Sequence, residues 1–169
     1  MSAFVVEHRD LLPRGSLTPS QNGVALASFV GIAFLAALPS AGLDLPATYE
    51  SLTKPDWAPP GWLFGPVWTL LYVMIGAAAW GVWQRTGWSR PLVLWAIQLV
   101  LNAAWTPIFF GLHQPAWALL EIIVLWLAIV SLMVVFSPVA KWTAWLLAPY
   151  LAWVTFAAGL NAAIWLLNP

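Results

Sequence analysis

The chain has 169 residues, of which 62% are hydrophobic and only 7% are charged, and its mean hydropathy is +0.85. Soluble domains carry about 25% charged residues, so this composition excludes an ordinary water-soluble globule and makes lipid the expected solvent. The net charge of zero argues against a nucleic-acid partner. The lack of cysteine excludes disulfides, thiolate metal sites and cysteine nucleophiles.

The predicted elements are a polar tail over residues 1–23, in which Pro13 and Pro19 act as breakers, and five transmembrane helices. Each of the five apolar stretches is close to the roughly 20 residues that cross a ~30 Å hydrocarbon core. They span about residues 24–43, 62–84, 91–111, 116–137 and 142–167. A transmembrane barrel needs shorter segments of alternating polarity, so we expect an all-α membrane protein whose residues 24–169 form a bundle of five transmembrane helices.

The connections between these helices are short, with one exception. Residues 85–90, 112–115 and 137–141 leave room only for antiparallel neighbours. Residues 44–61 form a proline-rich loop that is long enough to act as a lid, and we call it the lid loop.

Basic residues are divided unevenly between the two sides of the predicted bundle. The lid-loop side has only Lys54, whereas the side of the tail and of the second and fourth connections carries Arg9, Arg14, Arg85, Arg90 and Lys141. The positive-inside rule therefore predicts a cytoplasmic N-terminus and a lid loop outside.

Fourteen tryptophans need an explanation, and eight of them have an ordinary one. These eight lie near predicted helix ends, where indole rings suit the headgroup region. They are Trp57, Trp62, Trp83, Trp88, Trp117, Trp142, Trp145 and Trp165.

Three other groups of aromatic and amide residues fall at one depth beneath the lid loop. Each group follows helical spacing and so shares one face of its helix. The groups are Trp68 and Tyr72 in the second helix, Gln98, Asn102 and Trp105 in the third, and Trp153, Ala157 and Asn161 in the fifth.

Two interpretations of these residues stay open at this point. Amides in hydrocarbon are costly unless paired, so Gln98, Asn102 and Asn161 should face the bundle interior. Each amide alone is explained by an interhelical hydrogen bond, worth on the order of 0.6 kcal/mol. Their coincidence with the aromatic rings instead favours a ligand cavity for a large planar or sterol-like apolar molecule.

The remaining polar residues form no catalytic constellation. The two histidines lie apart, His8 in the polar tail and His113 in a short connection, and no phosphate-binding loop or metal-ligand spacing occurs. Glu121 is an acid within the predicted fourth helix, either functional or reaching the interface. Pro107 and Pro149 should kink their helices.

Three ordered blocks of sequence carry a specific signature. The first is Lys54-Pro55-Asp56-Trp57-Ala58-Pro59-Pro60-Gly61-Trp62, followed by Gly65-Pro66-Val67-Trp68-Thr69 and Leu71-Tyr72. The second is Gln98-Leu99-Val100-Leu101-Asn102 leading to Trp105-Thr106-Pro107-Ile108-Phe109-Phe110-Gly111, and the third is Pro149-Tyr150-Leu151-Ala152-Trp153 leading to Leu160-Asn161. Together they resemble the TspO/MBR family of tryptophan-rich sensory proteins and translocator proteins, or peripheral-type benzodiazepine receptors.

The resemblance implies a five-helix bundle in a membrane, here a bacterial cell membrane, that forms a homodimer and has a pocket beneath its first loop. It implies porphyrins such as protoporphyrin IX or haem as ligands, benzodiazepine-type ligands, no covalently bound cofactor and no metal site. The family's pocket positions fall on Trp57, Pro59, Trp68, Tyr72, Asn102, Trp105, Trp153 and Ala157. In the sterol-associated segment of animal members this chain departs from the pattern, with Ala162 and Leu166.

The function that this resemblance implies is a tetrapyrrole-binding sensor or regulator. One alternative is light- or oxygen-dependent porphyrin degradation, for which Trp68 and Trp153 would supply redox-active indoles. Another is transport of porphyrin or of sterol-like apolar cargo.

Overall fold

The computed structural model describes residues 18–168, so most of the expected polar tail lies outside the described residues. Five helical spans within them are long and apolar enough to cross a membrane: Pro19–Ser40, Gly61–Thr86, Arg90–Gly111, Pro115–Phe136 and Lys141–Leu167. The described residues contain no strand. The expected all-α fold with five transmembrane helices is confirmed.

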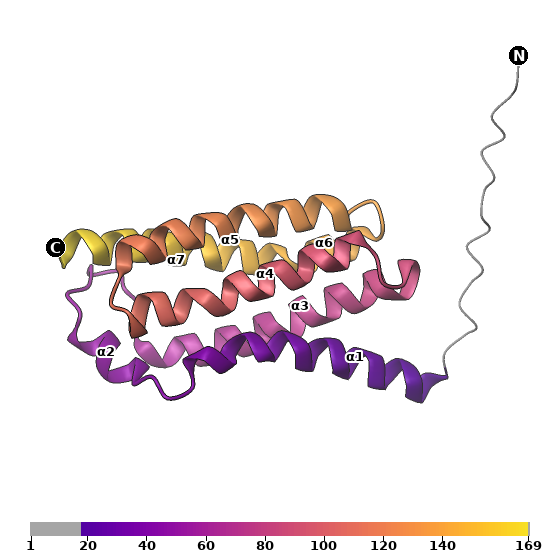
Figure 1. Cartoon of the computed structure of the whole chain (residues 1–169), viewed down its shortest axis with the longest axis horizontal. Coiled ribbons are helices and arrows are strands. Elements are labelled where there is room, and N and C mark those ends of the chain that lie inside the picture. The colour runs from indigo at the N-terminus through magenta and orange to yellow at the C-terminus, as the bar shows by residue number, and fades with distance from the viewer. Residues whose placement is uncertain (1–17, 169) are drawn as a thin grey trace, which may run out of the picture.

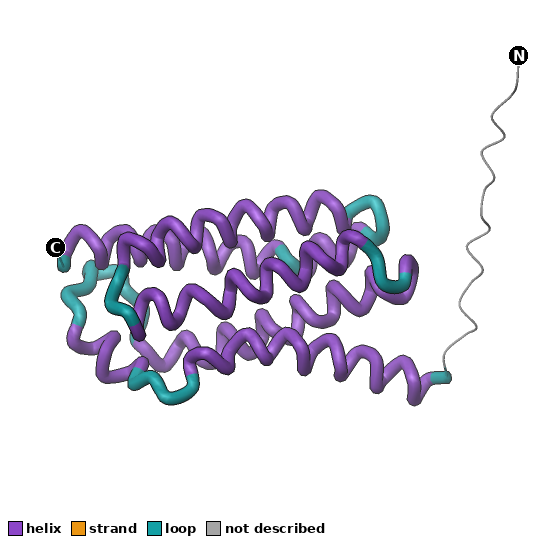
Figure 2. Tube along the Cα trace, in the orientation of Figure 1, coloured by secondary structure: helices purple, strands orange, loops and turns teal. Residues whose placement is uncertain are grey.

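Most spans are built from more than one helical segment. The break between the two segments of the fifth span is drawn as a short loop in Figure 2. The first consists of α1 (Pro19–Phe34) and the 3-10 segment η1 (Leu35–Ser40), and the second of the 3-10 turn η2 (Gly61–Leu63) and α3 (Phe64–Thr86). The third consists of α4 (Arg90–Thr106) and the π-helical turn η3 (Pro107–Gly111). The fourth is the unbroken α5 (Pro115–Phe136), and the fifth consists of α6 (Lys141–Leu146) and α7 (Ala148–Leu167).

The first helix begins at Pro19, five residues earlier than expected. The Thr18 hydroxyl accepts a hydrogen bond from the Gln21 backbone N–H, and the Gln21 side chain accepts one from the Thr18 N–H. This reciprocal capping box satisfies two N–H groups at the helix start. Proline at the first helical position has no N–H to leave unpaired. Pro19 is therefore the first residue of this helix, and it does not act as the helix breaker that we expected.

The lid loop contains a short helix that its prolines did not suggest. Helix α2 (Leu45–Ser51) begins after Asp44, whose carboxylate accepts a hydrogen bond from the Ala47 N–H at 3.2 Å. At its other end the Lys54 ammonium donates to the carbonyl oxygens of Tyr49, Glu50 and Leu52. Side chains thus satisfy polar groups at both ends of this helix.

Two prolines interrupt regular α-helix, as expected. Pro107 begins the π-helical turn that ends the third span. The fifth span is interrupted at Leu147, two residues before Pro149, and this break separates α6 from α7. Proline lacks the N–H that would continue the helical hydrogen-bond pattern.

The spans lie side by side and alternate in direction (Figure 1). Helix α1 packs against α3, α4 against α5, and α5 against α7. The lid loop and the C-terminal end of α7 lie at one end of the bundle, and the connections α3–α4 and α5–α6 lie at the other, where α1 begins. Arg85, Arg90 and Lys141 therefore stand at the end opposite to Lys54; which end faces the cytoplasm stays a prediction.

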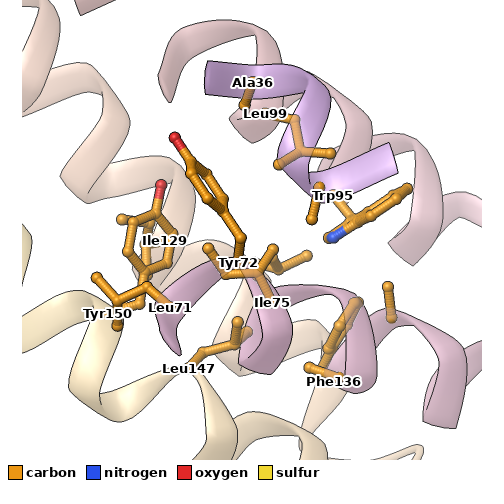
Figure 3. Packing of buried hydrophobic residues seen from close by; sticks show 14 of the residues in the cluster. Ala36, Leu71, Tyr72, Ile75, Trp95, Leu99, Ile129, Phe136, Leu147 and Tyr150 are labelled. Carbon is orange, nitrogen blue, oxygen red and sulfur yellow. The ribbon is translucent and has the colours of Figure 1, made fainter. Parts of the chain in front are cut away.

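The core runs along the bundle axis and includes side chains from every span (Figure 3). Ile75, Ile129 and Phe136 are completely buried in it. Helices α1 and α3 come very close together at Gly76, where an added Cβ atom would lie 2.5 Å from the Val30 Cα atom. Small residues permit such close backbone approach between membrane helices.

We predict that Gly76→Ala loosens the packing of α1 on α3, because the backbone of Val30 would have to move. Overpacking of this kind costs about 1–3 kcal/mol, and a fall in melting temperature, followed by circular dichroism in one detergent, measures it. The matched control is Gly159→Ala in α7, where an added Cβ meets no atom within 4 Å. Equal melting temperatures for the two variants would contradict the prediction.

Candidate ligand-binding cavity

A cavity of about 720 Å³ lies at the lid-loop end of the bundle. This volume is within the range of about 300–1,000 Å³ that small-molecule sites occupy. The lining is mostly apolar and aromatic and comes from all five spans and from the lid loop. Its aromatic members are Phe34, Tyr49, Trp62, Phe64, Trp68, Tyr72, Trp105, Phe110 and Trp153.

Neighbouring aromatic rings hold the two tryptophans Trp68 and Trp153 in position. The Trp68 ring stacks on Tyr72, with centroids 5.3 Å apart and ring planes at 29°. The Trp153 ring meets Phe64 edge-on at 5.7 Å and packs against Phe156 at 5.5 Å. Contacts of these geometries between aromatic rings are favourable, so both indoles are fixed elements of the cavity wall.

A chain of four hydrogen-bonded side chains forms the deep end of the site. The Tyr72 hydroxyl donates to Asn102 Oδ1 at 3.0 Å, and Asn102 Nδ2 donates to the Tyr150 hydroxyl at 3.1 Å. The Tyr150 hydroxyl in turn donates to Gln98 Oε1 at 3.0 Å. The two tyrosines, shown within the core in Figure 3, thereby link α3, α4 and α7.

Tyr72 and Asn102 are the two members of this chain that line the cavity. The Asn102 amide has one further N–H, and its oxygen has a further lone pair. The floor therefore offers both a donor and an acceptor, held in place by tyrosines from two other helices.

The three predicted intramembrane amides are all buried and all hydrogen-bonded between elements. Asn161 accepts from Trp105 Nε1 at 3.1 Å and donates to the Pro115 carbonyl oxygen at 2.8 Å. Of the three, only Asn102 lines the cavity. Gln98 and Asn161 thus fit the interpretation as interhelical hydrogen bonds. Asn102 fits both interpretations, because it is hydrogen-bonded between helices and also lines the cavity.

Six of the eight expected site residues line the cavity: Trp68, Tyr72, Asn102, Trp105, Trp153 and Ala157. The other two, Trp57 and Pro59, do not. The Trp57 ring is 53% exposed and meets Phe156 edge-on at 5.7 Å. The Pro59 carbonyl oxygen accepts a hydrogen bond from the Tyr49 hydroxyl at 2.8 Å. Binding by any of the eight stays a prediction.

The lid loop contributes to the cavity through residues other than the two expected. Its part of the lining consists of Leu45, Pro46, Tyr49, Glu50, Pro60 and Gly61. Burial, with the adjacent Glu50 carboxylate, raises the pKa of Tyr49, so its hydroxyl stays protonated and keeps its bond to Pro59.

A second tie fastens the lid loop to the end of α7. Asn168 accepts from the Thr53 N–H at 3.0 Å and donates to the Thr53 carbonyl oxygen at 2.9 Å. The lid loop is therefore anchored at its middle, as well as where it joins the neighbouring spans.

The first span also lines the cavity, through Phe34, Ala37 and Ser40. The sequence carried no signal for this, because the span is apolar on all sides and has no stripe of polar or aromatic residues to mark one face. Two packing contacts bring it to the site: α1 packs on α3, with the Phe34 ring 5.3 Å from the Tyr72 ring, and the 3-10 segment η1 packs on α4.

Glu121 lies away from the cavity lining. Both of its carboxyl oxygens are buried without a hydrogen-bond partner among the described residues. Within the same part of the chain, no group of three or more histidine, cysteine, aspartate or glutamate residues is arranged to hold a metal ion.

We predict that Tyr150→Phe destabilises the protein more than Tyr72→Phe. The Tyr150 hydroxyl makes two hydrogen bonds, and its loss leaves two buried atoms, Asn102 Nδ2 and Gln98 Oε1, without that partner, at a cost on the order of 1–3 kcal/mol. Loss of the Tyr72 hydroxyl removes one bond and leaves a single atom, Asn102 Oδ1, without that partner, in a residue that lines the cavity. Thermal unfolding of both variants in one detergent measures the difference, and equal losses would contradict it.

Comparison of the sequence with known proteins assigns the chain to a family. The model of the TspO/MBR family matches residues 24–166. The chain is 48% identical over 126 residues to the tryptophan-rich protein TspO of Chlorobaculum tepidum, which covers 72% of this chain and 79% of the relative. It is 42% identical to the tryptophan-rich sensory protein of Cereibacter sphaeroides, covering 71% and 76%, and 42% identical to the human translocator protein, covering 69% and 72%. The chain therefore belongs to the TspO/MBR family of integral membrane proteins.

Proposed function

We propose that this protein is a membrane sensor or regulator that binds a tetrapyrrole in the cavity beneath the lid loop. The observation that carries the proposal is the cavity itself: about 720 Å³, walled by the fixed indoles of Trp68 and Trp153 and with few polar groups. A flat macrocycle gains about 0.5–1.5 kcal/mol from each favourable ring contact beyond the burial of its area. The polar floor at Asn102 supplies a hydrogen-bonding anchor.

The relatives' names are consistent with this proposal but describe only those proteins. One relative is named a sensory protein and another a translocator protein. Among the described residues, the lining includes neither histidine nor methionine as an axial ligand for haem iron. Metal-free protoporphyrin IX needs no such ligand, so it is the appropriate first probe.

We predict that purified protein in lipid nanodiscs binds protoporphyrin IX in darkness. Trp68→Ala combined with Trp153→Ala should weaken that binding about tenfold or more, because two stacking faces are removed. Porphyrin absorption and tryptophan quenching measure the affinity. Trp145→Ala is the control, since that ring lies outside the cavity lining and is 74% exposed. Equal affinity in the wild type and in a folded double variant would rule out this cavity as the porphyrin site.

A second candidate function is light-driven porphyrin oxidation, favoured by the stacking of Trp68 on Tyr72 at the cavity wall. We predict that Trp68→Phe combined with Trp153→Phe keeps most porphyrin binding, because phenyl faces remain, yet abolishes most light-dependent loss of the porphyrin spectrum. Phenylalanine is much harder to oxidise than indole. An unchanged rate of loss per bound porphyrin would assign these tryptophans to packing and leave the binding function in place.

A further inference from the structure

The cavity end of the bundle carries more acidic than basic groups. The lid loop, residues 44–61, contains Asp44, Glu50 and Asp56 but only one basic residue, Lys54, a net charge of −2. Arg85, Arg90 and Lys141 lie at the other end. Among the described residues that line the cavity, Glu50 alone is charged.

The Glu50 carboxylate lies at the rim where the lid loop meets the second span. A Cβ atom placed on Gly61, itself a lining residue, would be 3.7 Å from Glu50 Oε1. The other carboxylate oxygen, Oε2, is 3.7 Å from Lys54 Nζ. One side of this carboxylate thus faces a lysine and the other faces the cavity rim.

Lys54 is held in place by the end of α2 and is not a lining residue. Its ammonium donates to three carbonyl oxygens, of Tyr49 at 2.7 Å, Glu50 at 3.2 Å and Leu52 at 3.3 Å, and lies 4.8 Å from the centroid of the Tyr49 ring. An ammonium has three donor hydrogens, and these carbonyls occupy them. If the Lys54 side chain turned toward a ligand, it would therefore lose the hydrogen bonds that cap the end of α2.

We propose that Glu50 is a specificity-determining residue that selects against ligand carboxylates at the cavity rim. This inference rests on the proposed tetrapyrrole function and narrows its substrate class: the site favours tetrapyrroles whose peripheral acids are esterified or amidated over those with free propionates. Two carboxylates close together disfavour ionisation of both. The Glu50 side chain is 69% exposed, so water and salt screen part of this repulsion and the expected selectivity is modest.

The test compares protoporphyrin IX, which has two propionates, with its dimethyl ester. Both are titrated against wild-type protein, Glu50→Gln and Asp56→Asn in phosphatidylcholine nanodiscs, which have no net lipid charge. The measured quantity is the ratio of the two dissociation constants for each protein. Partition of each porphyrin into lipid is the same for every variant and therefore cancels when the ratios are compared.

Asp56→Asn is the matched control, since it removes the same charge from the same loop at an exposed residue outside the cavity lining. Glu50→Gln keeps the side-chain shape and removes only an exposed ion pair, which contributes little to folding. Glu50→Gln should strengthen binding of the free acid relative to the ester by a factor of about 3 to 10, as expected for one partly screened charge. Asp56→Asn should change the ratio less than twofold.

The outcomes separate this inference from the function on which it rests. If both porphyrins bind and the ratio is the same in wild type and Glu50→Gln, the selectivity is overturned and the tetrapyrrole site stands. If Asp56→Asn changes the ratio as much as Glu50→Gln does, the cause is the general charge of the loop and the specific role of Glu50 is overturned. If neither porphyrin binds the wild type, the proposed function itself fails.

Discussion

The structure depends on one constraint: lipid offers no hydrogen-bond partners, so polar side chains between the spans must satisfy one another. The chain from Tyr72 through Asn102 and Tyr150 to Gln98 meets most of this constraint by linking three helices. The Gln98 Nε2 group at its end has no hydrogen-bond partner among the described residues. Each such bond is worth only on the order of 0.6 kcal/mol. Their geometric effect is larger than this energy suggests, because every member fixes the rotation of the helix that carries it.

The same constraint accounts for the shape of the cavity. Asn102 is held from two sides, and its position among the lining residues puts a polar group at the open space beneath the lid loop. Aromatic contacts fix the walls above this floor. Hydrogen bonds of Tyr49 and Lys54 hold the lid loop together, and Asn168 ties it to the end of α7. The site is therefore largely formed before any ligand arrives, which lowers the entropic cost of binding.

Much of this arrangement could be predicted from the sequence, since it follows from length and periodicity. Apolar runs of about 20 residues predict the spans, and helical spacing beneath one loop brought Trp68, Asn102 and Trp153 to a common depth. The lining by Phe34 and Glu50 could not be predicted in this way, because it depends on how α1 and α2 pack and not on a repeat in their own residues. Pro19 was misjudged because the same residue breaks a helix in its interior and favours its first turn.

The most direct test of the tetrapyrrole site is a structure of this protein with protoporphyrin IX bound. We predict that the macrocycle lies between Trp68 and Trp153, above the Asn102 amide, with its propionates turned away from Glu50. A porphyrin found only on the outer surface of the bundle, with the cavity beneath the lid loop empty, would contradict the account.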